Sequence, residues 1–373
     1  MKVSWRFEWI EGYDEVLSPA FLRVWEGMVS RARNAHVFQE PALARAWLET
    51  KGNALRLVPR FCLATSNSGA AVLVPFCQVP HGHRNAWRRR LVSVGEPHFD
   101  YQDPVATWPP GDAPPWVEFW PKLTDELAAK GRWEHAMLLR LGTSSASPDT
   151  APDTSREAPV IRLEGRATLD DVLKDRSANH RKEVRLRIRR LRELGRAEFR
   201  VFAPLERAAA TDELHRLCEA YERLWVGSPS QALFRQPGTF SFYERLLETA
   251  LPAGLVHFSV QRAADRPVSW HFGFTRGETL HWYKPTYEKD FDAFSPGKVH
   301  LAQLIELGLR LGWREIDLGA GTEAYKYLWT DDARPLAQWH WQADTWRERI
   351  YRLARRGYEF LPRRVGPSRS ASS

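Results

Sequence analysis

Apolar residues in the second half of the chain recur with two periods, one typical of helices and one typical of strands. Over 209–227, Leu214, Cys218, Tyr221 and Leu224 recur at spacings of three and four, which predicts an amphipathic helix. AQWHWQA at 337–343 alternates between apolar and polar residues, which predicts a strand. Two further helices are predicted at 239–250 and 298–311, and further strands at 197–202, 255–261, 267–275, 279–284 and 315–318.

The first half of the chain repeats this order of elements. Strands are predicted at 5–10, 55–64, 69–77, 90–94 and 135–141, and helices at 18–31, 40–50 and 116–130. The repeated order predicts an α/β protein built from two tandem copies of one fold. Each copy is expected to contain a mixed central sheet flanked by helices.

The boundary between the two copies follows from composition. Residues 143–158 are rich in Ser, Thr, Pro, Ala and Asp and show no apolar period, which predicts a flexible linker. We therefore predict a first lobe at 1–142 and a second lobe at 159–361. Residues 362–373 are predicted to form a disordered basic tail.

A strongly basic helix is predicted at 178–194. Val184, Ile188 and Leu191 mark its apolar face, and Gly195 suits its C-terminal end. The other faces carry Arg181, Lys182, Arg185, Arg187, Arg189, Arg190 and Arg192. This pattern fits phosphate binding, duplex nucleic-acid binding or a solvated surface. The helix has no aromatic residue among its arginines, which argues against stacking on single-stranded nucleic acid.

Charge and composition narrow the class of protein. The 373 residues carry a formal net charge of +8, which favours anionic partners. The three cysteines lack CxxC spacing, which indicates a reducing compartment and no zinc site. The N-terminal residues lack the apolar run of a signal peptide, and the longest apolar runs are too short for a membrane span. We therefore expect a cytoplasmic protein without a metal.

Motifs for common enzyme classes do not occur in the sequence. It contains no GxSxG, HExxH, Walker A or GxGxxG pattern, so hydrolase, zinc protease, P-loop and Rossmann functions gain no support.

Four segments resemble a known family. They are VFQEP at 37–41, Gly95 followed by DYQDP at 100–104, SANHRK at 177–182, and Tyr287 with FSPG at 294–297 and DLGAGTEAYK at 317–326. With the element order, these segments resemble the GNAT superfamily of acyltransferases. Within it, they resemble the acetyltransferases related to the cellulose-biosynthesis protein CelD and the BioF2-like domain. That family is similar to the two-lobed Fem peptidyltransferases.

The resemblance implies an N-acyltransferase that moves an acyl group from acetyl-CoA or another acyl-CoA to an amine or hydroxyl. The implied acceptor is a small molecule or glycan, such as an amino sugar or a polysaccharide precursor. The glycine-rich pyrophosphate loop typical of single-domain GNAT enzymes is missing, because the matching position holds only Ser295, Pro296 and Gly297. An acyl carrier protein or a Fem-like aminoacyl-tRNA therefore remains an alternative donor. A non-enzymatic nucleic-acid-binding protein is the third alternative.

Candidate donor-binding residues cluster at a predicted helix start. Ser295, Pro296, Gly297 and Lys298 lie between a strand and a buried helix, where free amides and the helix dipole attract a pyrophosphate. An ordinary helix start with proline explains the same residues. Three further candidates for the phosphates of the donor are Lys326, Arg181 and Arg185.

Candidate catalytic residues are Asp317, Glu323 and Tyr283. Asp317 ends a strand and Glu323 follows the Gly319–Gly321 turn, so either carboxylate is placed to accept a proton from the acceptor. Tyr283 is a candidate acid for the thiolate leaving group. A capped turn explains the same carboxylates.

Candidate acceptor-binding residues come from both halves of the chain. Asp100, Tyr101 and Asp103 lie in a loop after a strand, and loops carry function disproportionately. Turn chemistry before Pro104 is the alternative. Asn179 opens the basic helix, and His271 lies in a strand, where a structural histidine is the alternative.

Overall fold

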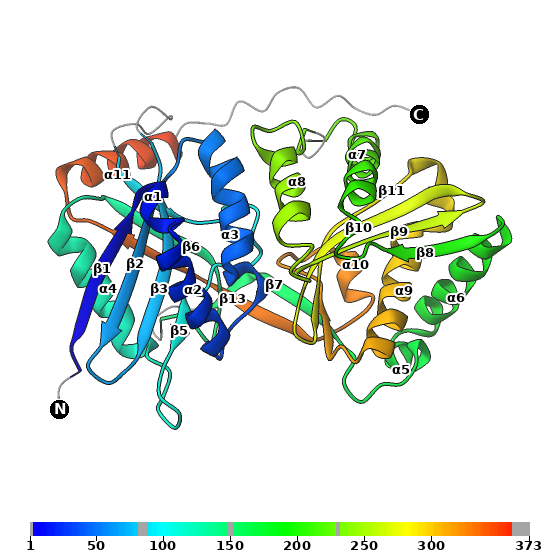
Figure 1. Cartoon of the computed structure of the whole chain (residues 1–373), viewed down its shortest axis with the longest axis horizontal. Coiled ribbons are helices and arrows are strands. Elements are labelled where there is room, and N and C mark those ends of the chain that lie inside the picture. The colour runs from blue at the N-terminus through cyan, green and yellow to red at the C-terminus, as the bar shows by residue number, and fades with distance from the viewer. Residues whose placement is uncertain (1–2, 81–87, 148–151, 229–231, 360–373) are drawn as a thin grey trace.

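The computed structural model describes residues 3–80, 88–147, 152–228 and 232–359 (Figure 1). The first lobe contains strands β1 (Trp5–Glu11), β2 (Val58–Ser66), β3 (Ala71–Gln78), β4 (Arg90–Ser93), β5 (Val105–Thr107) and β6 (His135–Gly142). Its helices are α1 (Gly12–Val16), α2 (Pro19–Arg31), η1 (Val37–Gln39), α3 (Pro41–Trp47), η2 (Leu48–Gly52) and α4 (Trp116–Lys130). All strands and helices predicted for this half are present.

The second lobe repeats this arrangement. Its strands are β7 (Pro152–Arg162), β8 (Ala197–Val201), β9 (Val256–Ala263), β10 (Arg266–Arg276), β11 (Thr279–Tyr287), β12 (Glu315–Asp317) and β13 (Ala333–Gln342). Its helices are α5 (Leu169–Leu173), α6 (Ala178–Glu193), α7 (Arg207–Leu224), α8 (Thr239–Thr249), η3 (Lys289–Phe294), α9 (Pro296–Leu311), α10 (Ala324–Tyr327) and α11 (Trp346–Glu359). The predicted basic helix is α6, and the predicted mixed α/β architecture is confirmed.

Local sequence signals set several helix ends. The Ser18 side chain accepts a hydrogen bond from the Phe21 amide at the start of α2, where Pro19 takes the first helical position. Ser177 caps α6 in the same way through the amide of His180. Gly312 ends α9 with φ 76, a left-handed conformation that glycine adopts at little cost.

One sheet runs through both lobes. Its strand order is β1-β2-β3-β4-β6-β13-β7-β12-β11-β10-β9-β8, with β5 paired to β3. Strand β13 lies between β6 and β7 and is antiparallel to both. Its alternation places Trp339 and Trp341 in a core cluster with first-lobe residues such as Trp120. The last strand of the chain therefore completes the sheet of the first lobe.

Strand β7 corrects the prediction of a flexible linker over 143–158. Residues 152–158 belong to this strand, which joins β13 to β12 in the centre of the sheet. The polar composition was misleading, because backbone hydrogen bonds to the neighbouring strands β12 and β13 hold strand β7 in place. Such pairing does not require a periodic pattern of apolar residues. Residues 148–151 of the predicted linker and the predicted tail at 362–373 lie outside the described residues.

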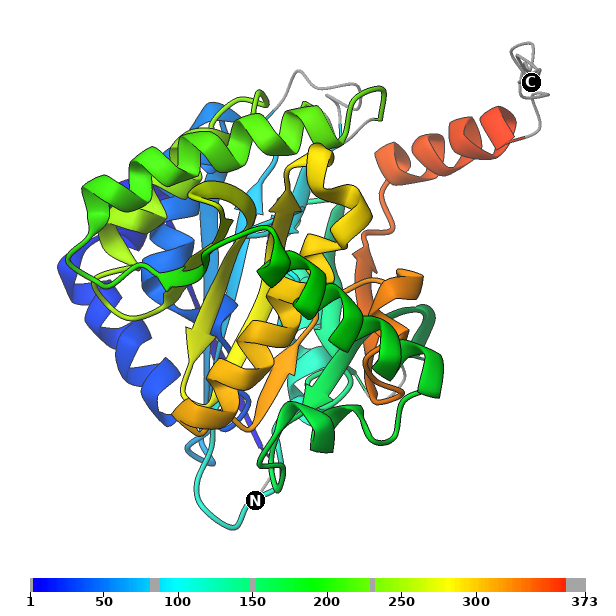
Figure 2. The ribbon, with the colours of Figure 1, turned by 90° about the vertical axis from the view of Figure 1, so that its right-hand side faces the viewer.

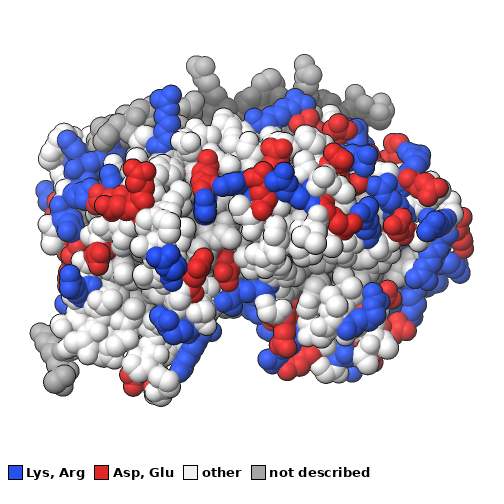
Figure 3. Space-filling view, in the orientation of Figure 1, with Lys and Arg blue, Asp and Glu red and all other residues white. Residues whose placement is uncertain are grey.

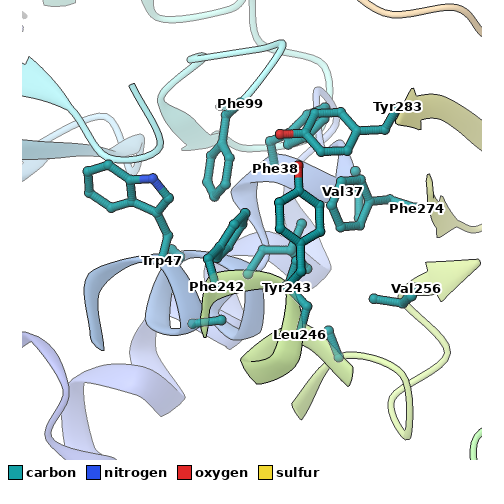
Figure 4. Close-up of a cluster of buried hydrophobic side chains, with 14 of the residues drawn as sticks. Val37, Phe38, Trp47, Phe99, Phe242, Tyr243, Leu246, Val256, Phe274 and Tyr283 are labelled. Carbon is teal, nitrogen blue, oxygen red and sulfur yellow. The ribbon is translucent and has the colours of Figure 1, made fainter. Parts of the chain in front are cut away.

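The two lobes also share a hydrophobic core. Figure 4 shows Phe38, Trp47 and Phe99 of the first lobe in one cluster with Phe242, Tyr243 and Phe274 of the second. The Phe38 ring centroid lies 5.3 Å from that of Phe99 and 5.6 Å from that of Phe274. Since interiors pack densely, this contact holds the lobes in one orientation.

No helix in the described part of the chain is long and apolar enough to cross a membrane.

We expect Phe38→Ala to lower the free energy of unfolding by about 3–5 kcal/mol, because the ring is buried between the lobes and leaves a cavity. Urea unfolding followed by circular dichroism measures this loss. The matched control Leu205→Ala, at a side chain 95% exposed, should change stability by less than about 0.5 kcal/mol. Separate transitions for the two lobes in the wild-type protein would contradict a shared core.

Candidate active site

The parallel strands β11 and β12 separate soon after they pair. They are in register at only three positions, from Thr279 opposite Glu315 to His281 opposite Asp317. Beyond that point β12 ends, whereas β11 continues to Tyr287 alongside β10. In α/β proteins, ligands bind where the carboxyl ends of parallel strands diverge. A ligand site is therefore expected at the gap between β11 and β12.

A cavity of about 600 Å³ lies at this gap, and we call it the splay cavity. Its wall is largely aromatic, with Tyr221, Trp225, Trp282, Tyr283, Tyr287, Tyr325 and Trp329. Ionisable side chains in the wall are Lys284, Asp292, Lys298 and Glu323. An apolar cavity with a few converging polar groups is the usual form of a small-molecule site.

Helix α9 begins at the splay cavity, as predicted for 295–298. Ser295 has a left-handed backbone (φ 50), and its side chain makes no capping hydrogen bond. A Cβ atom at Gly297 would have only Tyr287 Cδ1 within 4 Å, at 3.9 Å, so the backbone there is open to an approaching group. The first turn of a long helix attracts anions through its amides and dipole. The geometry thus suits the predicted phosphate contact.

Lys298 lines the same cavity, but an ion pair partly neutralises its positive charge. Its Nζ atom lies 2.7 Å from Oε2 of Glu183 in α6. The contribution of Lys298 to an anion site is therefore smaller than its sequence position indicates.

Asp317 is the most tightly held carboxylate of the site. Its side chain is fully buried and accepts hydrogen bonds from the Tyr101 hydroxyl at 2.6 Å, from Arg334 Nη1 at 2.8 Å and from the Gly319 amide at 2.8 Å. Burial, followed by the negative charge of Asp317, raises the pKa of Tyr101 well above its usual value. The hydroxyl therefore stays a donor. These contacts make Asp317 a structural link between the lobes, which argues against its predicted role as the base.

The segment after β12 forms the predicted glycine turn. Gly319 has φ 72 and Gly321 has φ 137. The Nζ atom of Lys326 donates to the Gly319 carbonyl oxygen at 3.0 Å and pairs with Glu323 Oε2 at 2.9 Å. Lys326 is buried and holds this turn, so it does not point freely at a donor. Glu323 is exposed and lines the splay cavity.

Asp100 reaches this turn from the first lobe. A Cβ atom at Gly319 would lie 2.5 Å from Asp100 Oδ2, so only glycine permits this approach. Burial raises the pKa of Asp100 to about 6, and the positive charges of Lys284, Arg140 and Lys326 limit that rise. Burial also lowers the pKa of Lys284, a shift that Asp100 opposes. The opposite charges of Asp100 and Lys284 therefore favour each other's ionised form, and Lys284 lines the splay cavity.

Tyr283 contributes its ring to the splay cavity but not a free hydroxyl. The hydroxyl donates to the His98 carbonyl oxygen at 2.5 Å, and burial raises the pKa of Tyr283. The close-up in Figure 4 shows this ring inside the interlobe cluster. Because the hydroxyl proton of Tyr283 already forms a hydrogen bond and the pKa is raised, Tyr283 is a poor general acid. This argues against its predicted role.

A second cavity of about 360 Å³ lies between the lobes, and we call it the interlobe cavity. It contains the predicted Tyr101 and Asp103 together with His36, His281 and Arg334. Asp103 Oδ1 accepts from the Gly142 amide at 3.0 Å, and Asp103 Oδ2 lies 3.3 Å from His36 Nε2. Burial lowers the pKa of His281 to about 4, so this imidazole is neutral. Because Tyr101 and Asp317 line this cavity, their hydrogen bond lies in its wall.

His271 lines neither the splay cavity nor the interlobe cavity, which argues against the prediction that it binds the acceptor. It is fully buried, and its ring stacks on Trp282 with centroids 4.5 Å apart. Its Nε2 atom accepts from the Tyr283 amide at 3.3 Å. A Cβ atom at Gly273 would lie 2.2 Å from the His271 ring, so the glycine makes room for it. This histidine is a core residue.

The three predicted residues of α6 also lie away from both cavities. Arg181 donates to the backbone carbonyl oxygens of Lys174 and Arg176, and Arg185 donates to Asp170 at 2.8 Å. Asn179 is exposed in the first turn of α6. Figure 3 shows basic and acidic side chains interleaved on the visible face, without a broad patch of one sign. Arg181 and Arg185 contact the protein's own groups, which argues against the predicted donor contact.

Sequence reasoning missed Lys284 as a site residue. The sequence shows Lys284 alternating with Tyr283 along the predicted strand. Nothing in the sequence indicated that the charge of Asp100 would act on Lys284. Among the described residues, no group of three or more His, Cys, Asp or Glu could hold a metal ion.

Residues 178–327 match the family model described as "Acetyltransferase (GNAT) domain". This part of the second lobe is therefore similar to a GNAT acetyltransferase domain. The matched region includes α6, the splay cavity wall from β11 and the glycine turn, and it ends before β13. It spans less than half of the chain. No curated protein sequence matches the chain.

Solved structures share the fold over both lobes. FemX is 11% identical with a TM-score of 0.60, over 89% of this chain and 98% of that chain. The C-terminal DUF2156 domain of an Agrobacterium fabrum protein, named for lysylphosphatidylglycerol synthetase, is 14% identical with a TM-score of 0.53, over 88% of this chain and 96% of that chain. These likenesses support the predicted two-lobed GNAT-like fold and, at such identities, the fold alone.

We expect Asp317→Asn to lower the free energy of unfolding by about 3 kcal/mol, because it removes a buried charge that pairs with Arg334 and accepts from Tyr101. Thermal and urea unfolding measure the loss. The matched control is Asp331→Asn, whose side chain is 80% exposed and pairs with Arg176, and which should cost about 1 kcal/mol or less. Equal effects of the two substitutions would contradict the structural role of Asp317.

Proposed function

We propose that this protein transfers an acyl group from an acyl-CoA, bound in the splay cavity, to an amine or hydroxyl acceptor. The observation that carries the proposal is the opening between β11 and β12, with the first turn of α9 exposed to it at Gly297. Amides and dipole at that turn would hold the pyrophosphate. The match of this region to the GNAT acetyltransferase domain supports the same reaction.

The aromatic wall of the splay cavity suits the remaining parts of the donor. Its volume of about 600 Å³ is in the usual range for an organic ligand. Trp282 and Trp329 offer apolar surface to the pantetheine arm and acyl group. We propose acetyl-CoA as the first donor to test, with longer acyl-CoA molecules as alternatives.

For the chemistry, we propose Asp100 as the proton acceptor in place of Asp317, because Asp100 lies against the Gly319 turn, although it lines neither cavity itself. A carboxyl with a pKa of about 6 is ionised at neutral pH and still basic enough to take a proton from an ammonium or hydroxyl. The acceptor then attacks the thioester carbonyl, and the carbon–sulfur bond breaks to release the CoA thiolate. Lys284 lines the cavity and is placed to stabilise the developing oxyanion. Glu323 remains the second candidate base.

The finer assignments rest on sequence. The four motifs support membership of the CelD and BioF2-like branch and an amino sugar or polysaccharide precursor as acceptor. The interlobe cavity supports a polar acceptor, because it offers Asp103 and the neutral ring of His281 to hydroxyl groups. Cys62, Cys77 and Cys218 are free and buried, which fits the cytoplasm.

An aminoacyl-tRNA donor is the second candidate, because the fold likeness to FemX extends over both lobes. Arg185 pairs with Asp170 and Arg187 lies near Glu183, so α6 offers less free positive charge than its sequence indicates. Loss of activity after ribonuclease treatment would favour the tRNA donor over acyl-CoA.

We expect isothermal titration calorimetry to detect acetyl-CoA binding, and Gly297→Trp to weaken it at least tenfold, because the indole would fill the space in front of α9. The matched control is Val117→Trp, at the second residue of α4, where the side chain is 66% exposed. This control should bind like the wild type. No binding of any acyl-CoA to folded wild-type protein would contradict the proposed donor.

We expect the acyl-transfer rate to rise with pH through about 6, because Asp100 must lose its proton before it can act as a base. Asp100→Asn should remove this limb of the profile and lower kcat at least a hundredfold. Glu323→Gln serves as the comparison and should keep the limb. The opposite result for these two variants would transfer the role to Glu323.

A further inference from the structure

Helix α11 is held against the first lobe by contacts of Glu348 and Tyr351 with Arg88. Arg88 donates to both carboxylate oxygens of Glu348, at 2.6 and 2.7 Å, and Glu348 is fully buried. The Arg88 guanidinium also lies 4.1 Å from the ring centroid of Tyr351. Glu348 and Tyr351 are three residues apart, so they lie on one face of the helix. This face fixes the base of α11 to the body of the protein.

The opposite face of α11 is apolar and exposed. Trp346 is 66% exposed, Ile350 is 49% exposed and Leu353 is 68% exposed. At about 100° per residue, these three positions fall within a stripe of about 60°, on the other side of the helix from Glu348. Figure 2 shows α11 projecting from the body of the molecule. Three large apolar side chains on one exposed stripe mark an interaction surface.

The C-terminal part of the chain also carries most of the protein's net charge. Residues 346–373 contain eight arginines and two glutamates, a net charge of +6 out of +8 for the whole chain. Arg347 lies over the Trp346 ring at 5.4 Å from its centroid, and its Nη1 atom lies 3.5 Å from Glu134 Oε1 of the first lobe. A Trp-containing apolar face beside arginines is the pattern of helices that lie in a membrane interface.

We propose that α11 docks this protein onto an anionic lipid bilayer. The apolar stripe would enter the boundary between headgroups and acyl chains, and the net positive charge of residues 346–373 would favour an anionic surface. With 14 residues, α11 is too short to cross a bilayer, so the contact is peripheral. A second copy of the chain is disfavoured as the partner, because two segments of net charge +6 would repel each other. This proposal does not depend on the proposed acyl transfer.

Flotation of the full-length protein with lipid vesicles tests the proposal. One set of vesicles contains equal parts of phosphatidylglycerol and phosphatidylcholine, and the other contains phosphatidylcholine alone. The test variant carries Trp346→Gln, Ile350→Gln and Leu353→Gln. The matched control carries Val117→Gln, Leu205→Gln and Leu311→Gln, which are exposed apolar residues elsewhere, 60–95% exposed against 49–68% in the stripe. Circular dichroism should show that both variants fold, because all six side chains lie at the surface.

We expect the wild type and the control to bind the anionic vesicles, and the α11 variant to bind at least tenfold more weakly. Binding should be weaker in high salt and on phosphatidylcholine alone. Absence of binding to anionic vesicles, or equal binding by the wild type and the α11 variant, would overturn the proposal. A wild-type dimer in sedimentation equilibrium that the α11 variant abolishes would overturn it too, by assigning the stripe to a second copy.

Discussion

The hydrogen bonds of Asp317 hold together the parts of this protein that make the site. The Asp317 carboxylate accepts hydrogen bonds from Tyr101 of the first lobe, from Arg334 of β13 and from the Gly319 amide in the turn after β12. A buried charge is tolerated only when such donors compensate its desolvation. The carboxylate therefore fixes the first-lobe loop against the glycine turn, and the position of Asp100 depends on that arrangement.

Strand β13 also joins the two lobes, through its pairing with β6 and β7. The last strand returns to the first lobe and lies between β6 and β7, so the sheet continues through the lobe boundary without an edge. Paired backbone and the shared core around Phe38 give the lobes a fixed relation. Pre-organisation of this kind places groups from both lobes around one cavity before a substrate arrives.

Periodicity was sufficient to predict most elements, because amphipathic helices such as 209–227 and alternating strands such as 337–343 encode their own burial. It was insufficient for β7, whose polar residues are held by strand pairing. Periodicity also could not show which of the two carboxylates, Asp100 or Asp317, is held by structural contacts. Burial, ion pairing with Arg334 and approach to Gly319 all arise from residues distant in sequence. The helix start at 295–298 could be predicted because its signal is local.

The division of the predicted residues between two cavities has a chemical consequence. Ser295 to Lys298 and Glu323 line the splay cavity, whereas Tyr101 and Asp103 line the interlobe cavity. Asp100 and Gly319 approach each other near the end of β12, beside the hydrogen bond from Tyr101 to Asp317. If donor and acceptor occupy different cavities, the reacting atoms must meet at this junction. Asp100, a carboxylate of the first lobe that faces a turn of the second, lies at this junction.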